Sequence, residues 1–220
     1  MRLDAALARI LGSTVALALF AAVGTALVAF TYEATAERIR LNQREALLRS
    51  LHAVIAPGSH DNDLFNDHLE LWVPELQDGN RPVVAYRARR QGRPVAAALV
   101  VAAPDGYNGT IRLLVGVRYD GTLTGVRVLE HHETPGLGDA IDEERSDWIL
   151  QFAGLSLDNP PLNRWKVKRD GGVFDQFTGA TITPRAVVKA IRKTLIYYRE
   201  HRDLVFSGAP AAAGGEQDHG

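Results

Sequence analysis

The chain has 220 residues, a length typical of one or two domains, and its 25 basic and 26 acidic residues leave a formal net charge of −1. This balance argues against a nucleic-acid-binding protein, which normally carries a basic face. Because the sequence contains no cysteine, disulfide scaffolds, iron–sulfur clusters, thiolate zinc sites and cysteine nucleophiles are excluded. Any redox chemistry must come from a bound organic or haem cofactor.

An uncharged apolar stretch lies near the N-terminus, between Arg9 and Glu33. As a helix, residues 10–30 would be roughly 31 Å long, which is enough to cross a bilayer. We therefore predict a transmembrane helix over residues 10–32. A cleaved signal peptide is the alternative, since residues 34–36, Ala-Thr-Ala, have the form of a cleavage site. The apolar stretch is, however, longer than the core of a usual signal peptide.

The charges beside this span predict its orientation. Arg2 and Arg9 precede it, and positive charge next to a first helix tends to stay in the cytoplasm. Residues 1–9 are therefore expected to be cytoplasmic. The chain beyond the span is expected outside the cytoplasm.

After the span, residues 33–56 have the pattern of an amphipathic connecting helix that docks on the following domain. Pro57-Gly58 should end that helix. Its apolar positions at helical spacing are Ile39, Leu47, Leu48, Leu51, Val54 and Ile55.

The next stretch, residues 61–67, reads Asp-Asn-Asp-Leu-Phe-Asn-Asp and superficially suggests a calcium loop. Its fifth position, where an oxygen ligand is needed, is Phe65, and the glycine at the sixth position is missing. We therefore expect a solvated turn.

Strands dominate the middle of the chain, in two predicted hairpins. Residues 83–89 and 95–102 flank a Gln-Gly-Arg-Pro turn, and residues 111–118 and 123–129 flank a turn that contains Asp-Gly, a strong hairpin signal. Most simply they form one antiparallel sheet. Residues 165–168 are a candidate further strand, and a short helical pattern covers 139–152.

The last predicted helix has Thr183 as its N-cap and Pro184 as its first residue. Its basic face is expected to be solvated. That face comprises Arg185, Lys189, Arg192 and Lys193. The predicted fold class is α+β, with a domain over residues 57–207 made of an antiparallel sheet and flanking helices. Residues 208–220 are too poor in apolar bulk to fold and are expected to be a disordered tail.

The segment before this helix, residues 175–184, brings small and hydroxyl residues to a helix N-terminus, with Gly179 allowing close backbone approach. Free N–H groups and the positive end of the helix dipole suit such a place to a phosphate. No lysine follows the glycine as in a P-loop, and a plain helix start explains the segment equally well.

Residues 175–181, Asp-Gln-Phe-Thr-Gly-Ala-Thr, resemble the flavinylation motif of the FMN-binding domain family. In that family Asp, two variable positions, Ser or Thr, and Gly-Ala-Thr precede a helix, and the final threonine is esterified to the phosphate of FMN. Here that residue is Thr181. Many members have a small residue where this chain has Gln176. Through Pro184 the stretch resembles the G subunits of Rnf ion-translocating electron transport complexes more than the C subunits of the sodium-pumping NADH:quinone oxidoreductase.

The likeness covers nearly the whole exported region in the same order. It includes the single N-terminal span, Asp-Asn-Asp-Leu at 61–64, Gly-Tyr-Asn-Gly at 106–109 and His-Glu-Thr-Pro-Gly-Leu-Gly at 132–138. The last of these segments could be a tight turn, or its glycines could let the backbone approach a flavin ring.

The resemblance implies a membrane-anchored electron-carrying subunit with covalent FMN, in an ion-translocating oxidoreductase complex (a translocase) that links ferredoxin and NAD. It implies as partners the other membrane and peripheral subunits of the Rnf complex, and a magnesium-dependent flavin transferase that uses FAD. Such a subunit completes no reaction alone. It is expected as a single-pass protein of the bacterial inner (cytoplasmic) membrane, with its flavin domain on the periplasmic side. A free-standing flavoprotein reductase and a non-redox scaffold with unmodified Thr181 remain the alternatives.

The candidate cofactor site follows from the same resemblance. Thr181 is the attachment residue and Asp175 a recognition residue for the transferase. No catalytic residue is expected, because no Ser-His-Asp arrangement can be identified, and no metal site, because His131 and His132 lack a third ligand. The other candidate contacts are Thr178, Gly179, Ala180 and Thr183 near the attachment residue, and Glu133, Thr134, Gly136, Leu137 and Gly138 in the loop.

Overall fold

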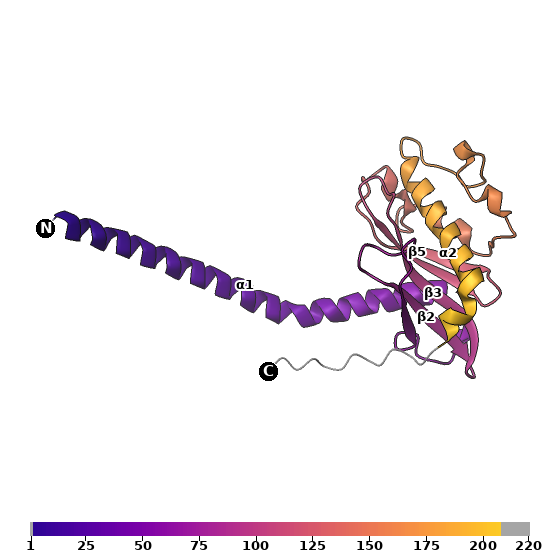
Figure 1. Cartoon of the computed structure of the whole chain (residues 1–220), viewed down its shortest axis with the longest axis horizontal. Helices are drawn as coiled ribbons and strands as arrows, with labels where there is room; N and C mark the ends of the chain where they lie inside the picture. Colours follow the sequence, from indigo (N-terminus) through magenta and orange to yellow (C-terminus); the bar gives the residue numbers. More distant parts are fainter. Residues whose placement is uncertain (1, 208–220) are drawn as a thin grey trace. The chain divides into compact units, whose positions relative to one another are not determined.

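The computed structural model describes the backbone of residues 2–207 and the side chains of residues 11–207 (Figure 1). The predicted disordered tail, residues 208–220, lies outside the described residues, as do the side chains of residues 2–10. The chain divides into two units, Met1–Ala46 and Leu47–Gly220. Each unit is considered by itself.

Helix α1 spans Arg2–Val54. Its residues up to Ala46 belong to the first unit, and its last residues belong to the second. Its segment from Leu11 onward is long and apolar enough to cross a membrane, and none of the apolar window is buried in the protein. The helix continues without interruption through Glu33 into the residues of the predicted connecting helix. It ends before Pro57, where a short 3₁₀ turn, Pro57–Ser59, begins.

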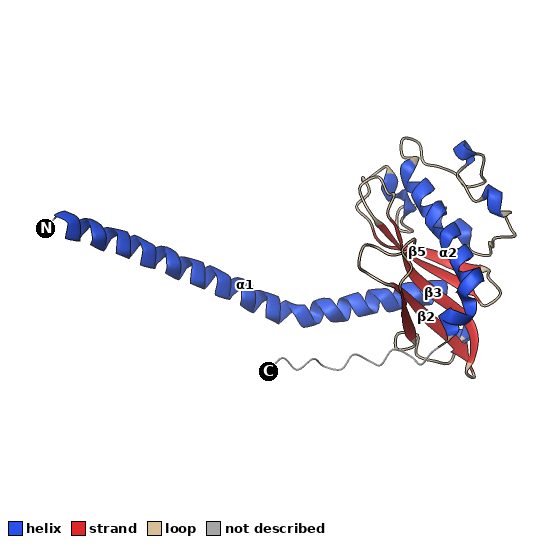
Figure 2. Cartoon of the chain, viewed as in Figure 1, coloured by secondary structure: helices blue, strands red, loops and turns tan. Residues whose placement is uncertain are grey.

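Within the described residues, five strands form one antiparallel sheet in the order β1-β2-β3-β4-β5 (Figure 2). The four predicted strands are confirmed within two residues at each end, and the edge strand β1 is additional. The strands are β1 His68–Leu71, β2 Val83–Arg90, β3 Arg93–Ala103, β4 Ile111–Arg118 and β5 Leu123–Glu130.

The two faces of the sheet bury different clusters of apolar side chains, as the alternation along a strand requires. In β3, Leu99 and Val101 join the larger cluster, which includes the apolar face of helix α2, Ile182–Phe206. Ala98 and Val100 join the smaller cluster, which includes Leu51 from the last turns of α1. The sheet is therefore the middle layer of the second unit. This arrangement confirms the α+β class.

The predicted strand at 165–168 is wrong. Trp165 is 1% exposed and packs against the rings of Phe152 and Phe174, so burial of its indole, not strand pairing, sets the local backbone. Only an isolated bridge joins Val167 to Phe174. The helical pattern at 139–152 forms two 3₁₀ helices, Gly138–Ile141 and Asp147–Phe152. Two further 3₁₀ helices, Leu162–Arg164 and Lys168–Asp170, flank the tryptophan.

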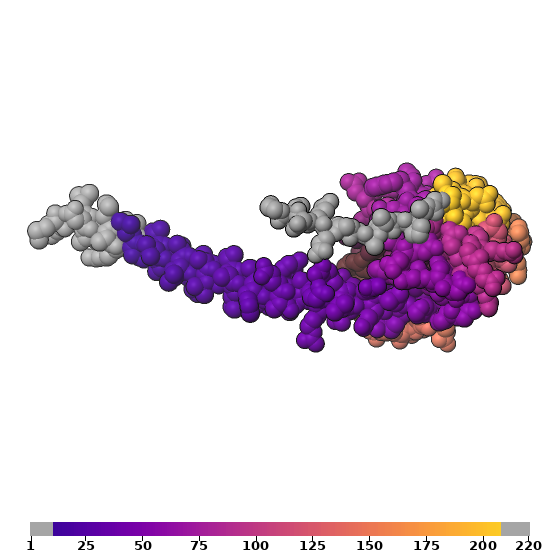
Figure 3. Space-filling view, turned by 90° about the horizontal axis from the view of Figure 1, so that it is seen from below, coloured from indigo at the N-terminus to yellow at the C-terminus, as the bar shows by residue number. Residues whose placement is uncertain are grey.

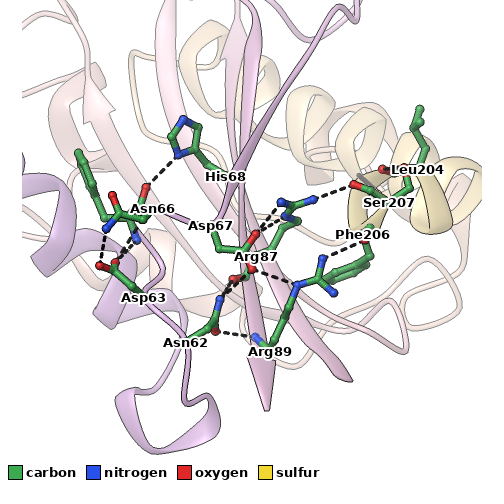
Figure 4. Close-up of polar contacts among 11 residues, drawn as sticks. Asn62, Asp63, Asn66, Asp67, His68, Arg87, Arg89, Leu204, Phe206 and Ser207 are labelled. Carbon is green, nitrogen blue, oxygen red and sulfur yellow. Dashed lines mark hydrogen bonds and ion pairs between the residues drawn. The ribbon is translucent and has the colours of Figure 1, made fainter. Parts of the chain in front are cut away.

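The predicted solvated turn at 61–67 is wrong for Leu64 and Asp67. Leu64 is 3% exposed and joins the smaller apolar cluster, and Asp67 is 8% exposed. Asp67 lies beside Arg87, which is fully buried (Figure 4). The Arg87 guanidinium donates to Asp67 Oδ1 at 2.6 Å, and Arg89 Nε donates to Asp67 Oδ2 at 3.0 Å. Asn62 Nδ2 also donates to Asp67 Oδ2, at 3.0 Å. Among the described residues, no cluster of metal-ligating side chains occurs.

The same two arginines hold the C-terminal end of α2. Arg87 Nη1 donates to the carbonyl of Ser207 at 2.7 Å, and Arg89 Nη2 donates to the carbonyl of Phe206 at 2.9 Å. Carbonyls at a helix end lack partners within the helix. Side chains from β2 therefore stabilise the C-terminal end of α2 (Figure 4).

Candidate functional site

A tight turn precedes α2. Phe177 and Ala180 form an isolated antiparallel bridge, and the Ala180 N–H donates to the Phe177 carbonyl at 3.2 Å. Gly179, the third residue of this turn, has φ of 80°. A side chain is disfavoured in this left-handed region, so glycine is the residue that permits the turn. The turn delivers the chain to the first residues of α2.

Helix α2 begins at Ile182 with Thr181 as its N-cap, so the predicted N-cap Thr183 and first residue Pro184 are wrong by two positions. Thr183 is 1% exposed, and its hydroxyl donates to the Glu133 carboxylate. The Thr183 hydroxyl, which was predicted to cap the helix, therefore bonds instead to Glu133, a residue far away in the sequence. Thr181 makes no side-chain capping bond.

Glu133 is 5% exposed, and both oxygens of its carboxylate accept hydrogen bonds. Oε1 accepts from the backbone N–H of Asn108 at 3.1 Å, and Oε2 accepts from the hydroxyl of Thr183. The backbone N–H of Glu133 donates to His131 Nδ1 at 3.1 Å. One acidic residue thus joins the 106–109 turn, the 133–138 loop and the first turn of α2.

Gly138 packs directly against this junction. A Cβ atom at Gly138 would lie 2.6 Å from Glu133 Oε2 and 2.8 Å from Thr183 Oγ1. Real Cβ atoms do not approach so closely, so any larger residue must displace one of these two groups. The loop can therefore lie against α2 only with glycine at this position.

We expect Gly138→Ala to lower the free energy of unfolding by about 1–3 kcal/mol, because the added methyl group overpacks the junction of Glu133 with Thr183. Urea denaturation followed by tryptophan fluorescence measures the change. Gly58→Ala is the matched control, since a Cβ there meets nothing within 4 Å. Equal stabilities of the two variants would contradict the close packing of Gly138.

A pocket of about 330 Å³ lies where these segments meet, within the size range of small-molecule sites. It brings together the two sequence segments that were predicted to hold the cofactor. Three of its residues expose large apolar or aromatic surface: Tyr107 is 65%, Leu137 44% and Ile182 45% exposed. The lining residues are Tyr107, Glu133, Thr134, Leu137, Gly138, Gly179, Ala180, Thr181, Ile182 and Thr183.

Three of the predicted site residues, Asp175, Thr178 and Gly136, do not line this pocket. The carboxylate of Asp175 pairs with Lys168 at 2.6 Å, and its carbonyl accepts from the Trp148 indole at 2.8 Å. All three remain candidate residues outside the pocket.

Two pocket residues were not among the predicted site residues. Tyr107 belongs to the Gly-Tyr-Asn-Gly segment, for which the sequence indicated no role. Ile182 gave no signal beyond its place beside Thr181.

The start of α2 retains donors for an anion. The carbonyl of the N-cap residue, Thr181, accepts a hydrogen bond from the backbone N–H of Arg185 at 3.3 Å. Within the part of the chain that the structure describes, the backbone N–H groups of Ile182 and Thr183 donate to no acceptor. Unpaired N–H groups and the positive dipole end together make a helix N-terminus suited to phosphate.

The basic face of α2 carries two cations that form exposed ion pairs. Arg185 binds Asp170 with bonds of 2.6 and 2.9 Å, and Lys189 lies 2.5 Å from Asp105. The hydrogen bond from Arg185 holds the pKa of the Asp170 carboxyl below its usual range. These exposed pairs add little stability.

Residues 106–196 match the family model of the FMN-binding domain, and residues 1–54 match that of the RnfG N-terminal region. The G subunit of the ion-translocating oxidoreductase complex of Pseudomonas aeruginosa is 46% identical over 216 residues, 98% of this chain and 100% of the relative. The G subunit from Vibrio cholerae is 50% identical over 186 residues, 84% and 88% of the two chains. That of Pseudoalteromonas atlantica is 46% identical over 193 residues, 88% and 90%.

Proposed function

The chain belongs to the family of G subunits of ion-translocating oxidoreductase complexes, and from that premise we propose that it carries electrons on an FMN bound covalently to Thr181. The chain is a membrane-anchored subunit of such a complex with an FMN-binding domain, and its role is a redox role. The proposal adds the covalent bond, its residue, the neighbouring electron carriers and the side of the membrane.

The observation that carries the proposal is the position of Thr181 in the pocket at the start of α2. Its hydroxyl has no hydrogen-bond partner among the described residues, and the N–H groups of Ile182 and Thr183 lie unpaired beside it. A phosphate ester on that oxygen keeps one negative charge, which the helix start stabilises by about 0.3–1 kcal/mol. The residues present therefore fit an FMN phosphate.

The rest of the pocket fits a flat aromatic ring system. Tyr107, Leu137 and Ile182 supply exposed apolar and aromatic surface, while Thr134 and the backbone of the 133–138 loop supply polar groups. When bound, flavin supplies one- and two-electron redox steps that no side chain of this protein can perform. The protein's part is to fix the ring and set its surroundings. We therefore assign ring contacts to the loop.

The attachment is a phosphoryl transfer in which the Thr181 hydroxyl oxygen bonds to the FMN phosphorus of FAD. The pyrophosphate bond of FAD breaks, AMP leaves, and the hydroxyl proton is released. A magnesium-dependent flavin transferase supplies the catalysis. The stretch that includes Asp175 and Thr178 lies outside the pocket and is available for recognition by that enzyme. In our proposal these two residues guide maturation and do not contact the ring, and Gly136 serves the loop's turn, where its φ is 78°.

Within the complex, we propose that the protein passes electrons along a route that links ferredoxin and NAD. The sequence contains no dinucleotide-binding fingerprint, so neighbouring subunits bind those substrates. Two alternatives are tested by simple observations. A free-standing reductase would purify without integral membrane partners, and a scaffold module would carry no flavin when made beside an active transferase.

The direct test is to express the full chain with a flavin transferase and to analyse it by intact and peptide mass spectrometry. We expect complete conversion to the FMN adduct, with the modification confined to the peptide that contains Thr181. The same chain made without the transferase is the control and should remain unmodified. An unmodified chain in both preparations would refute the proposed covalent flavin.

The uncharged stretch bounded by Arg9 and Glu33 leads to a prediction about topology. We expect the flavin domain to face the periplasm, because the positive residues precede the span. Protease added to intact spheroplasts should then digest the domain while a cytoplasmic marker survives. Protection of the domain would contradict the orientation. A soluble product that begins after Ala36 would instead support cleavage of a signal peptide.

A further inference from the structure

The wall of the pocket is held together by one buried carboxylate. Glu133 was predicted to contact the cofactor, but its two oxygens already accept from the Asn108 N–H and the Thr183 hydroxyl. Asn108 makes a second bond to the same loop, from Nδ2 to the hydroxyl of Thr134 at 3.2 Å. The Glu133 side chain is therefore occupied with the protein itself.

These bonds determine where the first turn of α2 lies. A hydrogen bond to a carboxylate is roughly twice as strong as one between neutral groups. The Thr183 hydroxyl is buried and has no other partner among the described residues, so without Glu133 it would be left unsatisfied. Gly138 closes the other side of the junction. The turn that begins with Thr181 is thus held against the 133–138 loop from within the fold.

We propose that Glu133 is a positioning residue for FMN attachment: it holds the first turn of α2 so that Thr181 lines the pocket while Thr183 stays buried. This inference rests on the proposed attachment to Thr181. The two threonines lie two residues apart and carry the same hydroxyl, but only that of Thr181 is free of a hydrogen bond among the described residues. Glu133 engages the other hydroxyl and so determines which one is presented.

The step that Glu133 serves is the transfer described above. The Thr181 oxygen forms the new bond to phosphorus as AMP leaves FAD, and Glu133 touches neither group. It acts through Thr183 and the helix. Recognition by the transferase is separate, because Asp175 and Thr178 make no hydrogen bond with Glu133 in the described structure. Loss of Glu133 should therefore slow the transfer without weakening binding of the transferase.

The test is steady-state kinetics of flavin transfer to the purified full chain in detergent, with FAD, Mg²⁺ and purified transferase. Glu133→Ala is expected to lower kcat about tenfold or more and to leave KM unchanged. That factor corresponds to the loss of one hydrogen bond to a charged group, here the bond from Thr183 to Glu133. Glu133→Gln keeps one acceptor at the same length and should restore part of kcat. Glu130→Gln, an exposed acid that lies 3.4 Å from Arg112, is the matched control and should match wild type.

A double-mutant cycle links the effect to the proposed bond. Thr183→Val removes the donor and keeps the shape, so combining it with Glu133→Gln should cost much less than the sum of the two single changes. Hydrogen exchange of the flavin-free chain gives a second readout. The amide of Arg185, bonded to the Thr181 carbonyl, should exchange faster in Glu133→Ala than in the control.

The outcomes separate the two proposals. If wild type is labelled and Glu133→Ala is labelled with the same kcat, the positioning role is refuted while the attachment to Thr181 stands. A rise in KM equal to the loss of kcat, or a Glu133→Gln variant no better than Glu133→Ala, would also refute it, because either indicates general disruption. If wild type is never labelled, attachment fails, and unchanged exchange at Arg185 would then refute the Glu133 junction as well.

Discussion

Thr181→Ala is expected to abolish covalent flavin. The variant removes the only threonine hydroxyl in the pocket that has no hydrogen-bond partner among the described residues, and Thr183 cannot replace it because its own hydroxyl is buried against Glu133. The fold should persist, since Thr181 makes no side-chain capping bond and its replacement should cost no more than about 1 kcal/mol. In-gel flavin fluorescence of the denatured chain, made beside the transferase, measures the loss.

Two matched variants give this prediction its controls. Thr181→Ser keeps a hydroxyl at the same place and should remain labelled, whereas Thr183→Ser should be labelled on Thr181 alone. Peptide mass spectrometry identifies the modified residue in each case. Flavin on Thr183 in the Thr181→Ala chain would show that the residue assignment is wrong.

Asp67→Ala should destabilise the domain by about 3–5 kcal/mol, because it removes the carboxylate that pairs with the fully buried Arg87. The change also removes the acceptor of Arg89 and Asn62 (Figure 4). Figure 3 shows this side of the second unit in space-filling form, with the C-terminal end of α2 in yellow. Urea unfolding of the full chain in detergent, followed by tryptophan fluorescence, measures the loss.

Two further variants test whether charge is the cause of that loss. Asp63→Ala removes an exposed carboxylate whose bonds stay within its own turn, so it should cost less than about 1 kcal/mol. Asp67→Leu combined with Arg87→Met removes both charges and should recover much of the stability lost in Asp67→Ala. A loss in Asp67→Ala no larger than that in Asp63→Ala would contradict the importance of the buried pair.

The sheet could be predicted from the sequence because hairpins are local features. The apolar strands β2 to β5 are separated by short turns, and the turn before β5 contains Asp120-Gly121, so pattern and turn chemistry agree. Strand β1 gave no such signal, since its four residues lie at the sheet edge and only Leu71 is buried. Asp67 was misjudged for the opposite reason. Its partner Arg87 is twenty residues away, and only the fold brings them together.

The site could be predicted in part, for similar physical reasons. The motif around Gly179 identified the segment before α2, but not the exact start of the helix. Thr183 is a good N-cap by type, and only the distant carboxylate of Glu133 shows that its hydroxyl is used elsewhere. In the same way, nothing in the sequence marks Tyr107, which becomes a pocket residue only because the fold brings its turn beside the 133–138 loop.

The composition of the pocket has a consequence for the order of biogenesis. None of its lining residues belongs to either apolar cluster that packs against the sheet, and both ends of α2 already have partners from the sheet side of the domain. Folding therefore does not wait for FMN to fill a gap in the core. In our proposal, the domain can therefore fold before the transferase acts, and attachment of FMN is the last step of maturation.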